Sequence, residues 1–286
     1  MDDEAWRAFH DALTKDLRRR GWKFSISDEA VLVEGPVKRT LGLQNLVQIC
    51  GAERQYSAWP ALIAEHVDHI EASTAQAIGA NARLADVERI LKVRLYPEEQ
   101  APFGVEGIVA PGIRWALVYD LPDAIQTVPA DHVAAWSTDL PELLKIGYRN
   151  VRESDPPQRI RRHPLQDGGE FVTIDGPSFF TATHALWIDE YVPEADPHGI
   201  LVVVPDRHNV MAAAITNATS VMATVGRMLD LAGKFHRVGP GSISKDLYWF
   251  REGRFTLLPS WFENGTLQFA PTVAFKEVLN ELAGPE

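Results

Sequence analysis

Hydrophobic and polar residues follow two periods along residues 171–262, and this stretch carries the clearest structural signal of the chain. Short alternating apolar runs indicate strands, and apolar residues three and four positions apart indicate helices. The expected strands are 171–174, 200–204, 210–215 and two within 247–261, and the expected helices are 178–191 and 217–236. This order favours an α+β fold with a mostly antiparallel sheet and helices packed on one face.

The rest of the chain shows the same two periods. Helices are expected at 4–20, 57–75, 141–152 and 273–282, and strands at 22–26, 30–33, 93–96, 113–119 and 267–269. Residues 41–51 fit a short helix or an extended segment. Residues 101–112 contain three glycines and two prolines and are expected to form a loop. Asn264-Gly265 predicts a tight hairpin turn, because both residues tolerate a positive φ.

Residues 154–169 interrupt these patterns. They hold five Pro and Gly residues and show no periodicity, which predicts a linker. The linker would separate an N-terminal α+β lobe at 1–153 from a C-terminal α+β lobe at 170–286. The two lobes could be similar, since parts of each run helix, strands, helix, strands, although no residue-level repeat connects them.

The charge balance restricts the possible partners. The 286 residues carry a formal net charge of −11, which opposes a broad surface for nucleic acid or for an anionic membrane. The basic run at 159–163 has no interleaved aromatic residue, as single-strand binding would require. We therefore expect a protein partner rather than nucleic acid or a membrane.

Cys50 is the only cysteine, so no internal disulfide and no multi-cysteine zinc site can form. It follows Leu46, Val47 and Ile49, a pattern typical of a small buried hydrophobic residue. The acidic residues 2–4 do not resemble the basic start of a secretory signal, and no window approaches 18 consecutive apolar residues. A cytoplasmic protein is expected.

Sequence motifs for common catalytic machinery do not occur. The chain has no G-x-x-x-x-G-K-[ST] phosphate loop, no G-x-G-x-x-G turn, no G-x-S-x-G elbow and no H-E-x-x-H helix. We therefore expect no cofactor. The densest group of potential metal ligands, at 65–71, is expected to form the solvated face of a helix rather than a metal site.

A ligand site is the best candidate for chemistry in the second half. Asp175 precedes an expected helix start, where free N–H groups suit an anion, and His184 lies in that helix. The hairpin turn after strand 200–204 adds a cation and an imidazole. The candidate ligand-binding residues are Asp175, His184, Asp206, Arg207 and His208. The alternative is that these residues only form turns and a helix cap.

Several segments resemble the YtpQ-like family of bacterial proteins, a domain of unknown function. They are Asp175-Gly176 before an aromatic pair and a helix, the strand and turn at 201–207, residues 242–244 leading into 247–250, the helix at 143–151, and residues 95–97. The resemblance implies a small cytosolic α+β protein of bacterial type. It implies no activity and no catalytic residues.

Two functions are compatible with the sequence. The first is a protein-binding or regulatory module, favoured by the missing catalytic motifs and by eight tryptophans that could anchor an interface. The alternative is a hydrolase or transferase acting on a small anionic substrate near residues 175–208. A pocket shared by Asp175, His184 and Arg207 would favour the enzyme.

Overall fold

The computed structural model describes residues 2–26, 30–34, 39–53, 55–75, 78–79, 81–100, 104–122, 124–165, 170–195 and 197–283. The chain divides into two compact units. Unit 1 comprises residues 1–79 and 120–126, and unit 2 comprises residues 80–119 and 127–286. Both units combine helices with antiparallel strands, which confirms the α+β class.

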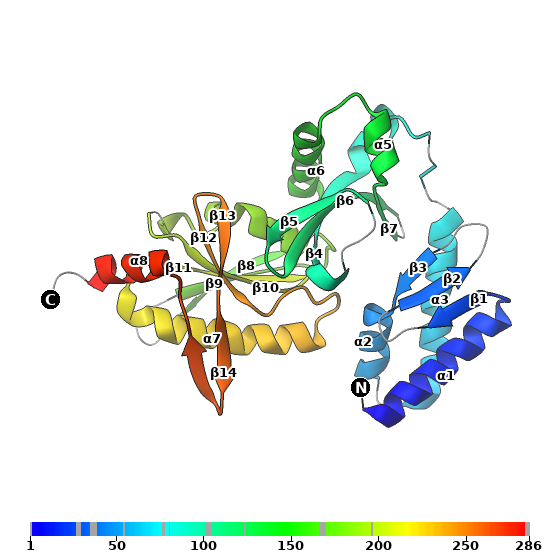
Figure 1. Cartoon of the computed structure of the whole chain (residues 1–286), viewed down its shortest axis with the longest axis horizontal. Helices are drawn as coiled ribbons and strands as arrows, with labels where there is room; N and C mark the ends of the chain where they lie inside the picture. The colour runs from blue at the N-terminus through cyan, green and yellow to red at the C-terminus, as the bar shows by residue number, and fades with distance from the viewer. Residues whose placement is uncertain are drawn as a thin grey trace. The chain divides into compact units, whose positions relative to one another are not determined.

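Unit 1 gathers helices around a three-stranded sheet (Figure 1). Its elements are α1 (Asp3–Arg19), β1 (Lys23–Ile26), β2 (Ala30–Glu34), β3 (Arg39–Gly42), α2 (Gln44–Ala52), η1 (Tyr56–Ala58) and α3 (Trp59–Ala75). Asp2 caps α1 by accepting a hydrogen bond from the Ala5 N–H at 2.8 Å. Phe9 and Leu13 lie four positions apart on one face of α1 and pack in a core cluster with residues of α3.

Unit 2 begins with a small sheet and the helix that covers it. The elements are α4 (Leu84–Val87), η2 (Glu88–Ile90), β4 (Leu91–Pro97), η3 (Glu98–Gln100), β5 (Glu106–Ala110), β6 (Ile113–Leu121), β7 (Ala124–Thr127), α5 (Ala130–Ala135) and α6 (Leu140–Ser154). The last two residues of β6 and the first three of β7 belong to unit 1. The order is β4-β6-β5, and β7 pairs with β6. Gly147 lets α6 lie close to β4, because a Cβ there would come within 2.9 Å of Val93 Cγ2.

A six-stranded antiparallel sheet forms the centre of unit 2, in the order β13-β12-β10-β11-β9-β8. The remaining elements are β8 (Arg159–Pro164), β9 (Glu170–Asp175), η4 (Thr181–Glu190), η5 (Pro193–Ala195), β10 (Ile200–Asp206), β11 (Asn209–Ala214), α7 (Ala218–Val238), β12 (Leu247–Arg251), β13 (Arg254–Leu258), β14 (Ser260–Glu263), β15 (Thr266–Phe269) and α8 (Val273–Ala283). The hairpin β14–β15 forms a sheet of its own.

Both faces of the six-stranded sheet are covered. Leu201 and Val203 of β10 pack in the cluster that includes α7 and α8, whereas Val202 and Val204 pack in the cluster that includes η4. Figure 1 shows α7 lying along the sheet. The continuous apolar run of β10 follows from this double burial. Helices therefore cover one face, as expected, and η4 covers the other together with residues of β4, β5 and β6.

Three details differ from the sequence prediction. The chain divides at residue 79 and not in the expected linker: α6 continues to Ser154, and β8 pairs with β9 along 159–164. The expected loop 101–112 contains β5, whose pairing with β6 overrides the local Gly and Pro signals. The expected helix 178–191 is instead η4, interrupted at Trp187 by non-helical backbone angles. The expected lobes 1–153 and 170–286 consequently do not match the two units.

None of the described helices is both long and apolar enough to cross a lipid bilayer.

Candidate functional site

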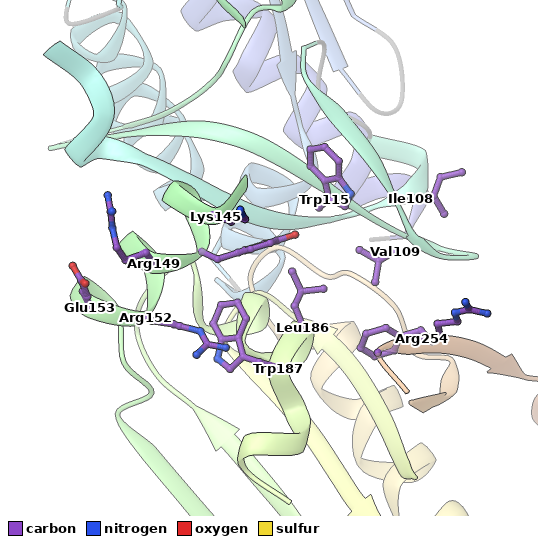
Figure 2. A pocket seen from close by; sticks show the side chains of 13 residues that line it. Ile108, Val109, Trp115, Lys145, Arg149, Arg152, Glu153, Leu186, Trp187 and Arg254 are labelled. Carbon is purple, nitrogen blue, oxygen red and sulfur yellow. The ribbon is translucent and has the colours of Figure 1, made fainter. Parts of the chain in front are cut away.

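Unit 2 contains a pocket of about 860 Å³. Its wall combines β5, β6, α6, η4 and the turn between β12 and β13. It is lined by Ile108, Val109, Trp115, Lys145, Tyr148, Arg149, Arg152, Glu153, Leu186, Trp187, Gly253, Arg254 and Phe255. Figure 2 shows Arg149 and Glu153 at one end of the pocket and Arg254 at the other.

One face of α6 supplies most of the charge in this pocket. Lys145, Arg149 and Arg152 are spaced by four and three residues, so the helix presents them side by side. Arg254, the first residue of β13, adds a fourth cation. The pocket is thus mainly cationic in a chain whose net charge is −11.

The cations on α6 form exposed ion pairs: Lys145 with Glu142 at 3.0 Å, Arg149 with Glu88 at 3.0 Å, and Arg152 with Glu190 at 2.6 Å. Exposed pairs of this kind stabilise a protein by only about 0–1 kcal/mol. Arg254 forms no ion pair within the described part of the chain. The four cations are therefore available to an anionic ligand at little energetic cost.

Aromatic side chains line the space between these cations. Trp187 packs edge-on against Tyr148 at a centroid distance of 6.0 Å, and the Arg152 guanidinium carbon lies 4.6 Å above the Trp187 ring. Figure 2 shows Arg152 and Trp187 side by side. Trp115 lies against Gly107, where a Cβ would come within 2.6 Å of the indole. The absence of a side chain at Gly107 therefore permits this position of Trp115.

His184 holds Trp187 in place from behind the pocket. Its Nε2–H donates to the Asp155 carbonyl at 2.9 Å, and its Nδ1 accepts from Tyr191 Oη at 2.5 Å and from Trp187 Nε1 at 3.1 Å. This pattern requires the neutral imidazole with the proton on Nε2. Burial lowers the pKa of His184, which keeps the ring neutral. His184 thus positions a wall residue and does not itself line the pocket.

The hairpin turn between β10 and β11 meets the segment after β9, because these strands end on the same side of the six-stranded sheet. Gly176 N–H donates to the His208 carbonyl at 3.2 Å, and His208 Nδ1 lies 3.0 Å from the Gly176 carbonyl. Ala182 N–H donates to the Arg207 carbonyl at 3.0 Å. Arg207 and His208 are also in contact, since Arg207 Nε donates to His208 Nε2 at 3.0 Å.

The side chains of the other three predicted ligand residues each interact with a different set of neighbours. Asp206 is fully buried and accepts hydrogen bonds from the His208 backbone N–H and the Asn209 amide, so it stabilises its own turn. Asp175 lies in β9 and pairs with Arg159 at 2.6 Å. His184 is buried in the network behind Trp187. Asp206, Arg207 and His208 therefore share the hairpin turn. The Asp175 backbone pairs with Asn209 beside that turn, but its carboxylate pairs with Arg159, and His184 lies in the separate network behind Trp187.

Two of the three carboxylates at 65–71 pair with an arginine. Arg20 pairs with Asp68 and with Glu71, each at 2.7 Å, and His69 Nδ1 lies 3.0 Å from the Glu65 carbonyl. Over the described ranges, no three His, Cys, Asp or Glu side chains are grouped so that they could hold a metal ion.

The residues that line the pocket were not among those predicted from the sequence. The spacing of Lys145, Arg149 and Arg152 in a predicted helix was a usable signal for a cationic face. The contributions of Trp115, Trp187 and Arg254 had no local signal, because three distant segments meet only after folding.

Comparisons of the chain with models of protein families, with curated proteins and with solved structures find no match, so the resemblance to the YtpQ-like family stays a prediction.

Proposed function

We propose that this chain acts by binding, and that the pocket in unit 2 receives an acidic, partly apolar segment of a partner protein. The observation that supports this proposal is the combination of a cationic rim with an aromatic wall in an otherwise acidic chain. Complementary charge accelerates encounter and selects the partner, while buried apolar contacts supply affinity.

The cationic rim of the pocket consists of Lys145, Arg149, Arg152 and Arg254, and these side chains can bind carboxylates of a ligand. Lys145, Arg149 and Arg152 lie in exposed pairs with glutamates of this chain, so carboxylates of a partner can replace those glutamates. Arg254 offers a guanidinium that no described carboxylate neutralises.

The aromatic wall of the pocket has the residue types that are typical of the centre of a protein interface. Trp, Tyr and Arg contribute most to binding energy at protein interfaces, and Trp115, Tyr148, Trp187 and Arg152 all line this pocket. Ile108, which is 65% exposed at the margin, extends the apolar surface. An apolar side chain of the partner could therefore pack between the charged contacts.

The catalytic alternative, a hydrolase or transferase near residues 175–208, has less support. It needs a free base close to Arg207, but both ring nitrogens of His184 are engaged in hydrogen bonds to other residues. The Asp206 carboxylate is likewise occupied inside its turn.

We further propose a reducing compartment, the cytoplasm, as the place of action. The proposal is supported by the single cysteine, which is buried.

Binding can be measured by fluorescence anisotropy of a labelled peptide of alternating glutamate and leucine. The double variant Arg149→Glu/Arg152→Glu should bind the peptide about tenfold more weakly or worse, because two attractive charges become repulsive. A peptide with lysine in place of glutamate should bind poorly to the original protein.

The matched control is Arg237→Glu/Lys276→Glu, which reverses two exposed charges on α7 and α8 outside the pocket. It changes the net charge by the same amount. Equal weakening by the control and the pocket variant would contradict the proposal, because only the overall charge would then matter.

A further inference from the structure

Two arginines in unit 2 share one aromatic ring. The guanidinium carbon of Arg207 lies 4.4 Å from the centroid of Phe179, and that of Arg94 lies 5.7 Å from the same centroid. The two guanidinium groups are thus at most about 10 Å apart, comparable to the Debye length at 0.1 M salt, so they repel each other.

Neither guanidinium has a carboxylate partner within the described part of the chain. Arg94 makes cation–π contacts with Tyr96 and Phe179, and its buried Nε has no hydrogen-bond acceptor. Arg207 Nε donates to His208, which is a neutral acceptor. Among the described arginines that are half-buried, Arg20, Arg114 and Arg251 pair with Asp or Glu. Arg94 and Arg207 depart from that pattern.

The lowered pKa values of Arg207 and His208 agree with an excess of positive charge around these two side chains. Burial, together with the nearby Arg94, lowers the pKa of Arg207 to about 10, although Asp206 and Tyr96 act in the opposite direction. Burial also lowers the pKa of His208, and Arg207 and Arg94 add to that effect. Both lowered pKa values mean that the protonated, positively charged forms of Arg207 and His208 are disfavoured. A bound anion would stabilise these charged forms and raise both pKa values.

Backbone contacts fix Arg207 in this position. Its N–H donates to the Gly241 carbonyl at 3.1 Å, and its carbonyl accepts from Ala182. A Cβ at Gly241 would come within 2.9 Å of Arg207 Cδ, so this glycine gives the side chain its space. The ring of Phe179 remains 44% exposed, which leaves the site open to solvent.

We propose that Arg94, Arg207 and His208 form a binding site for a phosphate group, independent of the pocket that carries the proposed function. A phosphate monoester carries a charge near −2, which matches two guanidinium groups. Each guanidinium can donate two parallel N–H bonds to a tetrahedral oxyanion. The two guanidinium groups, neither of which has a described carboxylate partner, are then the parts of the site that receive the anion.

The test uses three probes: inorganic phosphate, O-phosphoserine and phenyl phosphate, each at constant ionic strength with chloride as the reference. The imidazole resonances of His208 should shift saturably with phosphate, and its pKa should rise when the anion binds. Thermal unfolding should move upward by about 2 °C or more under near-saturating phosphate. Tighter binding of the two esters would indicate an organic phosphate, and equal binding the free ion; both outcomes support the site.

The variants Arg94→Gln and Arg207→Gln should each weaken phosphate binding at least tenfold. Without phosphate they should unfold at the same temperature as the original protein or higher, because one of two repelling charges is gone. Arg149→Glu/Arg152→Glu should leave phosphate binding unchanged, which separates this site from the pocket. His208 resonances that do not shift, or that shift equally with chloride, would overturn the proposal, and so would undiminished binding by both glutamine variants.

Discussion

Lys92 and Asp155 form a buried ion pair, with Lys92 Nζ 2.5 Å from Asp155 Oδ2. Lys92 lies in β4 and Asp155 directly follows α6, so the pair joins the small sheet to its covering helix. Asp155 also accepts hydrogen bonds from the hydroxyls of Ser154 and Ser178 and, through its carbonyl, from His184. One carboxylate therefore connects β4, α6 and the segment that leads into η4.

Breaking this pair should destabilise unit 2. Lys92→Met leaves the Asp155 carboxylate without its cation in a mostly buried position, which should cost about 3 kcal/mol in the free energy of unfolding. Asp155→Asn should cost a similar amount. The double variant should lose less than the two losses together, as measured by urea unfolding in a double-mutant cycle. Strictly additive losses would show that the two side chains do not interact.

The turn between β14 and β15 depends on glycine. Asn264 has φ 51° and Gly265 has φ 79°, which confirms the turn expected from Asn-Gly. Gly265→Val should lower the free energy of unfolding by about 1–2 kcal/mol, because a β-branched residue resists a positive φ. Gly265→Asn is the matched control and should lose less, since asparagine tolerates this region. Equal thermal unfolding of the valine variant and the original protein would contradict the expectation.

Cys50 should react slowly with thiol reagents. It is fully buried in α2, and burial raises the pKa of the thiol to about 11, so little thiolate exists at neutral pH. Labelling with a thiol-reactive dye should remain slow in the native protein and become rapid and stoichiometric in urea. Fast labelling of the native protein would instead indicate an accessible, reactive thiol.

The neutral state of His184 should make stability depend on pH. The folded-state pKa lies below the ordinary value of 6.5, so the unfolded chain binds a proton that the folded protein excludes. The contribution is fully present above pH 6.5 and is lost as pH falls from there toward the lowered folded-state pKa. Urea midpoints measured between pH 8 and pH 5 should therefore decrease.

His66, His208 and His236 have pKa values lowered in the same direction, so a variant must isolate His184. His184→Asn should reduce the slope of stability against pH, each variant being compared with its own value at pH 8. An unchanged slope would assign the effect to the other histidines.

The sequence by itself determined the elements whose side chains alternate or repeat locally. The helices expected at 4–20 and 141–152, the strand expected at 200–204 and the Asn264-Gly265 turn are all set by neighbouring residues, and each was found where it was predicted. The α+β class followed from the order of these elements.

Only the tertiary structure decided the domain division and the sites. β8 and β5 carry weak or contrary local signals and become strands because β9 and β6 pair with them. Trp187 and Arg254 reach one pocket, and Arg94 and Arg207 reach one ring, through pairings of strands far apart in the chain. Local sequence fixes which residues share a strand or a helix face, whereas long-range packing fixes which of those faces meet.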